Sequence, residues 1–390
     1  MSCTQRERRA VGLDAHPDVF TAAILAGSDA RAAQIVTVSA SLPLSQLEDW
    51  FTQHTTPDDQ IALEASGNSF DLQRRLVAIG RNAQVLESRR AGQITKAYCA
   101  HDKGDAIKIA RIWLSGLAHV VWTPDETTQL RRDLLHRYRR AVTDDTRCRN
   151  RVRSFLSDRS VRLPAGTRLT RPYAQADILQ LPRWKPEQCE LLQGLFEDMN
   201  HAHARRTELR RTIARQVAND PALRILLRLF GVREILAFTV GAIVGDIRRF
   251  RTAKQLVAYI GLNPRVAESG TSAANGPLAH HGRKDLRSML IEASHALLKY
   301  DNPLYRWGLR LKIRKGHNVA VAAVARKLTV AIWYLLNGMF TPLQEINTTL
   351  RIKIRKLAVA LGLPALRQMG YTTSKDFQEK LSKQLLTSAA

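Results

Sequence analysis

Short apolar runs and amphipathic stretches alternate through the first third of the chain. Three apolar or alternating runs, separated by turn-prone residues, predict a β-meander over residues 9–16, 19–25 and 33–39. Beyond them, runs typical of strands alternate with stretches whose apolar residues recur at helical spacing. These elements are a helix over 45–52, a strand over 60–66, a helix over 70–79, a strand over 83–87, a helix from 102 and a possible last strand over 119–122. Because this order is that of the RNase H-like fold, we expect an α/β domain over residues 1–123.

Helical spacing dominates residues 124–218. One long helical pattern covers 125–158 and another covers 186–217, and a proline and a glycine lie between them in 163–166. Helices of this length with a narrow apolar stripe are typical of an antiparallel hairpin or a coiled coil. We therefore expect a helical coiled-coil insert here, with a role in dimerisation.

Apolar periodicity continues into a C-terminal part that we expect to be mostly α-helical. Two short helices around Gly231 resemble a helix-hairpin-helix, whose turn presents backbone N–H groups to a phosphate. Residues 266–277 are small, polar and poor in apolar side chains, which predicts a loop. Further helical patterns cover 284–298, 303–314 and 319–336. We expect a C-terminal domain over 219–340 and a basic, helix-prone tail over 341–390, to which we assign no function.

The charge balance indicates a polyanionic partner. The 390-residue chain contains 60 Lys and Arg against 35 Asp and Glu, a formal net charge of +25. Arginine dominates, and its planar guanidinium pairs bidentately with phosphate, which favours nucleic acid over a generic anionic surface. A solvated basic surface is the alternative. The expected nucleic-acid-binding residues are Arg131, Arg132, Arg139, Arg140, Arg147, Arg151, Arg205, Arg206, Arg210, Arg265 and Arg283.

Cysteine usage and hydropathy argue against other classes of protein. Cys3, Cys99, Cys148 and Cys189 show no C-x-x-C spacing, so neither a zinc site nor a disulfide framework is predicted. No apolar run approaches the roughly 18 residues that cross a bilayer, and the N-terminus lacks the apolar region of a signal peptide. We expect reduced thiols, no membrane contact, and a cytoplasmic, nucleoid-associated protein.

Acidic residues interrupt the predicted core of the first domain. Asp14 ends the first strand, Glu64 lies in an otherwise apolar strand, and Asp102 and Asp105 share a face at the start of a helix. Taken singly, each fits a strand end that reaches solvent or a helix cap. An unpaired buried carboxylate is costly, and four converging carboxylates would repel one another without a cation. Mg²⁺ (or Mn²⁺) is the expected partner, because two such ions can clamp a phosphodiester.

The predicted loop offers hydroxyl groups beside cationic side chains. Ser269, Thr271 and Ser272 lie close in sequence to Arg265 and Arg283. A hydroxyl beside cations can act as a nucleophile toward phosphate. Polar filler of a flexible loop is the other interpretation.

Several short motifs occur in a fixed order between residues 9 and 340. They are Val11-Gly-Leu-Asp14, Ala62-Leu-Glu-Ala-Ser66, His101-Asp-Lys-Gly-Asp105, Tyr259-Ile-Gly-Leu-Asn-Pro264, Ser269-Gly270, Gly282 and Leu286-Arg287. Together they resemble the insertion-sequence 110 / 1111 transposase family. This resemblance implies a RuvC-like N-terminal domain, a coiled-coil insert and a C-terminal transposase domain.

The resemblance also implies a DEDD recombinase that excises and inserts the DNA of its own mobile element. By position, Asp14, Glu64, Asp102 and Asp105 would bind divalent metal, and Ser269 would attack the DNA backbone to form a covalent intermediate. Some members pair a structured RNA with donor and target DNA and assemble as tetramers of two dimers. The expected partners are therefore DNA, a guide RNA and further copies of the chain, as a dimer or tetramer.

Two positions depart from the family pattern. His280 stands where a lysine is frequent, and Glu268 replaces a serine just before Ser269. An acid beside the expected nucleophile disfavours the approach of a phosphate. Thr271 and Ser272 are the alternative hydroxyls.

Two other functions fit the same residues. In a junction-type endonuclease, the acids and metal would activate water and no serine bond would form. In a non-catalytic nucleic-acid-binding protein, the acids would be surface groups and helix caps.

Overall fold

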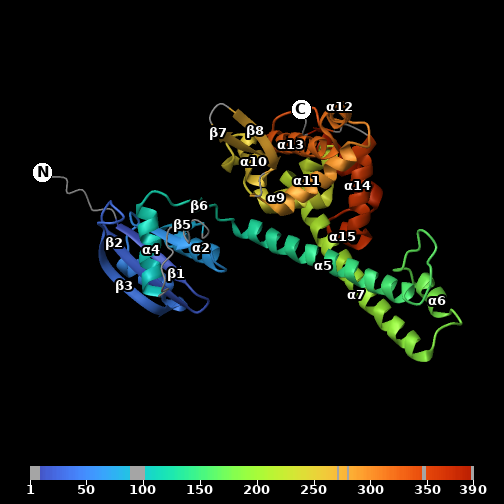
Figure 1. Ribbon diagram of the computed structural model, residues 1–390, viewed down its shortest axis with the longest axis horizontal. Coiled ribbons are helices and arrows are strands. Elements are labelled where there is room, and N and C mark those ends of the chain that lie inside the picture. Colours follow the sequence, from blue (N-terminus) through green and yellow to red (C-terminus); the bar gives the residue numbers. More distant parts are fainter. Residues whose placement is uncertain (1–8, 88–101, 270–271, 279–280, 345–347, 388–390) are drawn as a thin grey trace. The chain divides into compact units, whose positions relative to one another are not determined.

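The computed structural model describes residues 9–87, 102–269, 272–278, 281–344 and 348–387, without the side chains of 102, 103, 265–269, 272–275, 277, 348 and 387. The chain divides into two compact units, Met1–Asp125 and Glu126–Ala390. The first unit is α/β and the second is mostly α-helical, as expected from the sequence (Figure 1).

A mixed β-sheet forms the centre of the first unit. Its described strands are β1 (Arg9–Ala15), β2 (Val19–Ala26), β3 (Gln34–Pro43), β4 (Gln60–Glu64), β5 (Asn82–Leu86) and β6 (Val120–Val121). They lie in the order β3-β2-β1-β4-β5-β6. β2 is antiparallel to β1 and β3, whereas β1, β4 and β5 run parallel and β6 is antiparallel to β5. The predicted meander and the strands that follow it are confirmed.

Helices cover both faces of this sheet. They are α1 (Leu47–His54) and α2 (Ser69–Ala78) on one face and α4 (Asp102–Leu114) on the other. Alternate residues of a strand point to opposite faces. Val11 of β1 therefore packs in a cluster with residues of α1 and α2, whereas the neighbouring Ala10 packs against Ala106 of α4. Asp14 lies four residues after Ala10 on the same strand, so its side chain points to the same face of the sheet, the one that α4 covers.

A glycine in β1 lets α4 approach the sheet closely. A Cβ atom on Gly12 would overlap the carbonyl oxygen of Ala106 and lie 2.7 Å from the backbone nitrogen of Ala110. Both obstacles are backbone atoms of α4, so no side-chain rotation relieves the overlap. This contact therefore fixes the distance between α4 and β1. On α4 it lies at Ala106, the residue after Asp105, and on β1 it lies at Gly12, two residues before Asp14.

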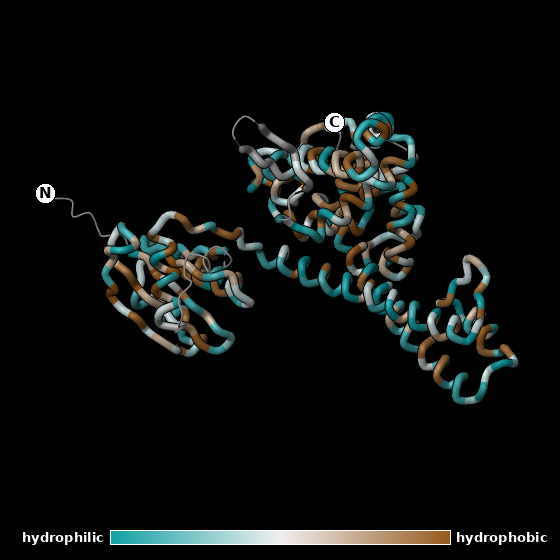
Figure 2. The backbone as a smooth tube through the Cα atoms, in the orientation of Figure 1, coloured by the Kyte–Doolittle hydropathy of each residue, from teal (hydrophilic) through white to brown (hydrophobic). Residues whose placement is uncertain are grey.

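The second unit begins with the helices α5 (Glu126–Ser157), α6 (Pro172–Leu179) and α7 (Pro186–Asn219). α5 and α7 pack along each other, and the two long helices expected from the sequence are confirmed. α5 is hydrophilic along most of its length because only a narrow stripe, including Leu135, is buried (Figure 2). Cys148 and Cys189 on these helices are free thiols, whereas Cys3 and Cys99 lie outside the described residues.

A helical core completes this unit. Its helices are α8 (Pro221–Ile225), α9 (Glu234–Val244), α10 (Ala253–Ile260), α11 (Lys284–Leu297), α12 (Tyr305–Lys315), α13 (His317–Leu336), α14 (Thr348–Leu361), α15 (Leu363–Gln368) and α16 (Ser374–Thr387), with short 3-10 turns between some of them. Within the described residues, α13 is the one helix long and apolar enough to cross a membrane. Its buried residues, such as Val324 and Leu328, pack into the core with α10, α11 and α12, which accounts for its apolar character.

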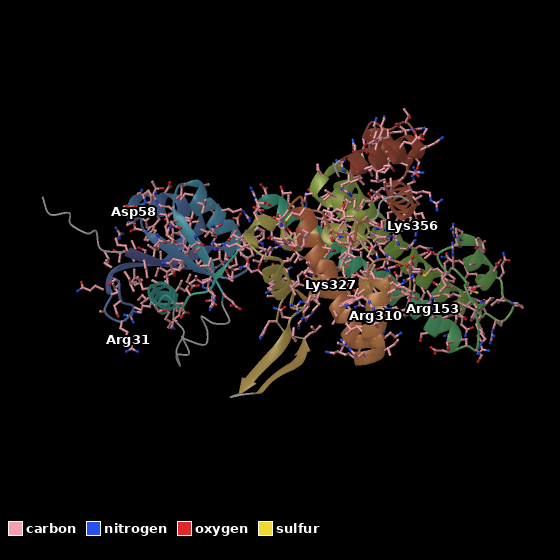
Figure 3. The ribbon with its side chains drawn as sticks, turned by 90° about the horizontal axis from the view of Figure 1, so that it is seen from above. Arg31, Asp58, Arg153, Arg310, Lys327 and Lys356 are labelled. Carbon is pink, nitrogen blue, oxygen red and sulfur yellow. The ribbon has the colours of Figure 1, made fainter. Side chains whose placement is uncertain are left out.

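The prediction of a loop over residues 266–277 is wrong. The chain forms a β-hairpin there, with strands β7 (Pro264–Ser269) and β8 (Ser272–Leu278), and it projects from the helical core (Figure 3). Backbone hydrogen bonds hold such a ladder without apolar side chains. Ser269 pairs with Ser272, so two residues connect the strands, and a glycine at the first of two connecting positions is a hairpin signal.

The close contact between α4 and β1 leads to a prediction about the stability of the first unit. Gly12→Ala should destabilise the first unit by about 3 kcal/mol, the upper end of the usual cost of overpacking, because two backbone segments must separate. Hydrogen exchange of peptides from β1 and α4 in the full-length protein measures this loss. The matched control is Gly67→Ala, whose added Cβ meets no atom within 4 Å. Equal protection in the two variants would contradict the prediction.

Candidate active site

Two acids lie side by side at the carboxyl ends of neighbouring parallel strands. Leu13 of β1 pairs with Leu63 of β4, so the next residues, Asp14 and Glu64, stand at the same level of the sheet. Glu64 follows Ala62 on the α4 face, because Ala62 packs against residues of α4. Both acids therefore point to the side of the sheet that α4 covers.

Helix α4 adds a third carboxylate. Burial raises the pKa of Glu64, and the negative charges of Asp14 and Asp105 raise it further. Such electrostatic coupling requires the three groups to lie near one another. The structure therefore brings together Asp14, Glu64 and Asp105. Asp102 begins α4 one turn before Asp105, but its side chain lies outside the described residues.

A lysine and a histidine stand beside these acids. Lys108 Nζ lies 2.7 Å from Asp105 Oδ1, and His16 Nε2 lies 3.8 Å from Asp14 Oδ2. Both are close in sequence to the acid that they contact. The sequence analysis missed them, although Lys108 follows Asp105 by three residues, the spacing at which helical side chains meet.

A small cavity opens between the ends of β1 and β4. Its volume is about 90 Å³, and Asp14, Glu64, Ser66 and Ser69 line its polar side. Ser69 accepts a hydrogen bond from the Ser66 backbone N–H at 3.1 Å, which fixes the turn that follows β4. The acids thus border a space that is accessible to a small ligand.

The donors at this edge are carboxylate oxygens, the ligands that hard divalent cations prefer. Within the described residues, however, no three Asp, Glu, His or Cys side chains are arranged to hold a metal ion. Burial and, to a smaller extent, the negative charges of Asp14 and Asp105 raise the pKa of Glu64, and a divalent cation would offset that negative charge. The chemistry of the donors therefore fits Mg²⁺, with Asp102 as the remaining candidate ligand.

Several arginines of the expected nucleic-acid surface form internal ion pairs. The pairs are Arg131 with Asp220, Arg206 with Asp145, Arg210 with Glu234, and Arg283 with Asp285. Arg132 donates a hydrogen bond to the carbonyl oxygen of Ala242 at 3.0 Å, and its burial lowers its pKa. These side chains hold the helices of the second unit together.

The remaining arginines of that set are exposed to solvent. They are Arg139 and Arg140, Arg147 and Arg151 on α5, and Arg205 on α7. The side chain of Arg265 lies outside the described residues. The exposed guanidinium groups can reach phosphates without breaking an ion pair in the core, apart from Arg147, which lies 3.6 Å from Asp144.

The base of the β7–β8 hairpin is locked by two glycines. A Cβ on Gly261 would overlap the carbonyl oxygen of His281, and one on Gly282 would lie 2.7 Å from the carbonyl oxygen of Ile260. Arg287 of α11 donates hydrogen bonds to the carbonyl oxygens of Gly261 and His281, at 3.0 and 3.3 Å. The motif residues around positions 261 and 282 thus serve to anchor the hairpin.

The expected nucleophile lies at the far end of this hairpin. Ser269 is the last residue of β7 and pairs with Ser272 of β8. Their side chains lie outside the described part of the chain, as do Thr271 and His280. The side chain of Glu268 is likewise not described.

Comparison with known proteins finds similarity to transposases. The family model described as "Transposase IS116/IS110/IS902 family" matches residues 223–306, from α8 to the start of α12. A probable family 20 transposase of Pseudomonas aeruginosa is 28% identical over 339 residues, which cover 84% of this chain and 96% of that protein. The transposase for insertion sequence element IS1111A of Coxiella burnetii is 27% identical, over 72% of this chain and 78% of its own. The family model and these relatives together make the chain similar to transposases of the IS110/IS1111 family.

A third relative extends this result. The transposase for insertion sequence element IS1328 of Yersinia enterocolitica is 24% identical over 72% of this chain and 84% of its own length. Each of these three relatives is described as a transposase, and the similarity supports the same activity for this chain. The family model covers the β7–β8 hairpin and its anchoring glycines, whereas the acids of the first unit lie outside the matched residues.

The raised pKa of Glu64 makes a prediction on pH and stability. A carboxyl group whose folded-state pKa is raised stabilises the fold while it is protonated, and this contribution is lost as the pH rises through that pKa. Glu64→Gln should therefore raise the unfolding temperature by a few degrees at neutral pH in metal-free buffer. The gain should vanish as the pH falls to about 4.3, the ordinary pKa of glutamate.

Thermal unfolding of the full-length protein with EDTA, at a series of pH values, measures this effect. Glu48→Gln is the matched control, because a hydrogen bond from Arg75 lowers the pKa of Glu48. That substitution should lower the unfolding temperature at neutral pH. Shifts of the same sign in both variants would count against the electrostatic explanation.

Proposed function

We propose that this protein is a transposase of the IS110/IS1111 family that cuts and rejoins DNA strands at the ends of a bacterial insertion sequence through a metal centre in its first unit. Asp14, Glu64, Asp102 and Asp105 would hold Mg²⁺ or Mn²⁺. The observation that carries this proposal is geometric: Asp14 and Glu64 stand at the same level of neighbouring parallel strands, on the face covered by α4, which begins with Asp102 and Asp105. Burial and the charges of Asp14 and Asp105 also raise the pKa of Glu64, a perturbation that is common at functional sites.

The topology of the first unit supports an RNase H-like, RuvC-like centre. The chain begins with an antiparallel meander, places β1 between β2 and β4, and follows with parallel strands. One acid ends the central strand, another ends its parallel neighbour, and the remaining two open the helix that covers them. This arrangement fits the DEDD order inferred from the resemblance.

The residues of the centre have distinct tasks. A divalent cation, when bound, polarises a phosphodiester and stabilises charge on its oxygens. Asp14 and Glu64, on rigid strands, would fix the position of the ion, and α4 would contribute acids from its own side. Lys108 offsets part of the negative charge of Asp105.

We assign the nucleophile to Ser269. Its oxygen forms a bond to the scissile phosphorus and its proton is released, while the bond from phosphorus to one sugar oxygen breaks and that oxygen takes up a proton. Rejoining is the reverse reaction with a different sugar hydroxyl. The position at the end of a projecting hairpin supports this assignment, because the serine can reach a strand that lies outside the helical core.

DNA is the substrate in this proposal, and the exposed arginines of α5 and α7 would contact its phosphates. A structured guide RNA would bind to the same basic chain, and two or four copies would act together at the nucleoid.

The metal centre makes the first activity prediction. Asp14→Asn should reduce DNA strand cleavage at least about 100-fold, because a metal ion supplies several kcal/mol of transition-state stabilisation. Cleavage of a plasmid that carries the element's ends, with Mg²⁺ present, measures this loss. Asp49→Asn, on an exposed position of α1, is the control and should keep full activity. Unchanged cleavage by Asp14→Asn would contradict the proposed metal centre, because cutting would then not depend on this carboxylate.

The serine makes a second, separate prediction. Ser269→Ala should abolish both cleavage and the covalent protein–DNA adduct, while DNA binding persists, because only the attacking oxygen is removed. Denaturing gel electrophoresis with labelled DNA detects the adduct. Ser272→Ala, the substitution of its partner across the hairpin, should leave the adduct intact. Persistent cleavage by Ser269→Ala would instead support an endonuclease that uses water.

A further inference from the structure

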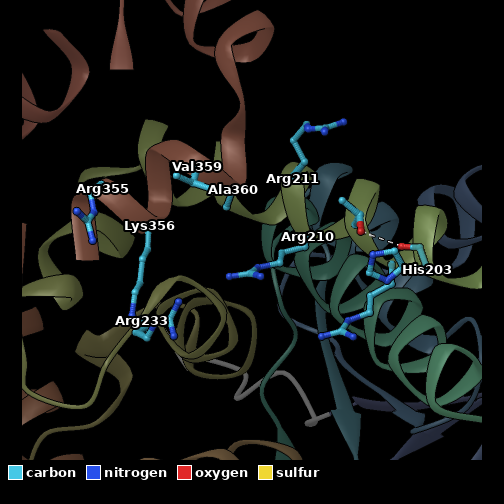
Figure 4. A pocket seen from close by; sticks show the side chains of 10 residues that line it. His203, Arg210, Arg211, Arg233, Arg355, Lys356, Val359 and Ala360 are labelled. Carbon is cyan, nitrogen blue, oxygen red and sulfur yellow. Dashed lines mark hydrogen bonds between the residues drawn. The ribbon is translucent and has the colours of Figure 1, made fainter. Parts of the chain in front are cut away.

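A basic cavity lies in the second unit, away from the hairpin. Its volume is about 700 Å³, and it opens between α7, the residue that precedes α9, and α14 (Figure 4). The lining side chains with positive charge are Arg206, Arg210, Arg211, Arg233, Arg355 and Lys356. They come from parts of the sequence about 150 positions apart, so only the fold brings them together.

Packing of α14 on α7 creates this cavity. Ile354 and Leu357 of α14 are buried in the core of the unit, and helical periodicity turns the neighbouring Arg355 and Lys356 outward. In the close-up, Lys356 extends from α14 toward Arg233, and Arg210 enters from α7 (Figure 4). The tail of the chain, to which the sequence assigned no function, thus supplies one wall of the cavity.

The wall carries an excess of positive charge. No Asp or Glu lines the cavity. Behind the wall, the buried Glu234 pairs with Arg210 at 2.5 Å and lies 3.7 Å from Arg233. One carboxylate therefore contacts two guanidinium groups, and it fixes their positions while balancing only one of their two positive charges.

A second buried acid plays the same part on α5. Asp145, whose side chain is 1% exposed, pairs with Arg206 at 2.6 Å and also with Arg149 at 3.0 Å. Arg355 and Lys356 are exposed and have no acidic partner within the part of the chain that is described. The cavity thus combines preordered guanidinium groups with two cations that are open to a ligand.

We propose that this cavity binds the sugar–phosphate backbone of an unpaired stretch of nucleic acid. Guanidinium groups held in place by buried carboxylates lose little freedom when they pair with phosphate oxygens. The volume lies within the range of about 300 to 1,000 Å³ typical of small-ligand sites, so it admits a nucleotide or two of a single strand. Among its described lining residues there is no Phe, Tyr or Trp, and the imidazole of His203 is held by Arg149, 3.0 Å away, so recognition rests mainly on phosphates and less on base stacking.

This site is independent of the chemistry proposed for the acids and for Ser269. The unpaired strand can be RNA or a displaced DNA strand, which share the phosphodiester backbone. Binding and cleavage can therefore be measured separately, and loss of one need not accompany loss of the other.

The test uses the full-length protein with Arg355→Gln and Lys356→Gln combined. Fluorescence anisotropy measures binding of labelled single-stranded RNA, single-stranded DNA and duplex DNA of equal length over a series of salt concentrations. We expect about tenfold weaker binding of the single strands and a slope of log affinity against log salt that is smaller by about 1.4, since each phosphate contact on a single strand contributes about 0.7. Duplex binding should change less.

The matched control is Arg314→Gln with Lys315→Gln, which removes the same two charges from exposed positions of α12. Hydrogen exchange of α14 peptides verifies that the cavity wall remains folded in the test variant. A larger loss for RNA or for single-stranded DNA identifies the strand that occupies the site, and either result supports the proposal. Equal losses for the two double variants, or a loss confined to duplex DNA, would overturn it.

Binding is also measured with Asp14→Asn. This substitution should leave single-strand affinity and its salt dependence unchanged while cleavage is lost. The cavity proposal therefore fails only on the binding data, and the proposed metal centre fails only on the cleavage data.

Discussion

The close contact between α4 and β1 at Gly12 is the constraint on which the acidic site depends. It holds a helix that carries acids against strand ends that carry acids, although these charges repel one another. The opposite face of the sheet offsets this cost with a large apolar core, in which Phe20 and Phe51 are fully buried. The two faces of the sheet therefore have different roles. The apolar face provides stability, and the face under α4 holds the mutually repelling acids of the proposed site in place.

In the second unit, a few buried acids order a larger number of arginines. Asp145 and Glu234 are almost fully buried, and each is shared by more than one cation. A buried charge of this kind is tolerated only when it is well paired. The strongly basic composition therefore serves two ends, since some arginines join helices while others, such as Arg140 and Arg205, remain exposed.

Periodicity in the sequence predicted most of the fold, because helices and strands repeat their apolar residues at different intervals. The bounds of α5 and α7 agree with the expected ranges to within about two residues. The proximity of Asp14, Glu64 and Asp105 to one another was also predictable, because a carboxyl group in an apolar strand is costly unless it is paired or bound to a ligand.

Features that depend on long-range packing or on turn geometry could not be predicted in this way. The partner of Arg206 lies 61 positions away, and the cavity formed with Arg355 depends on how α14 packs on α7. The β7–β8 hairpin was missed because its small polar residues give no alternating pattern. The glycine after Ser269 is a turn signal in this stretch. It indicates a two-residue hairpin turn only once the pairing of Ser269 with Ser272 is known.

The two proposed reactive groups have supports of different kinds. The acids stand on a sheet packed on both faces, which suits ligands that must hold a cation in a fixed geometry. Ser269 stands at the end of a two-stranded ladder whose base is locked by Gly261 and Gly282 and by hydrogen bonds from Arg287. An isolated hairpin of this kind is only marginally stable on its own, so its anchorage at the base determines where it projects. A nucleophile that must stay bonded to one DNA end while strands are exchanged needs such a support: extended at its tip and fixed at its root.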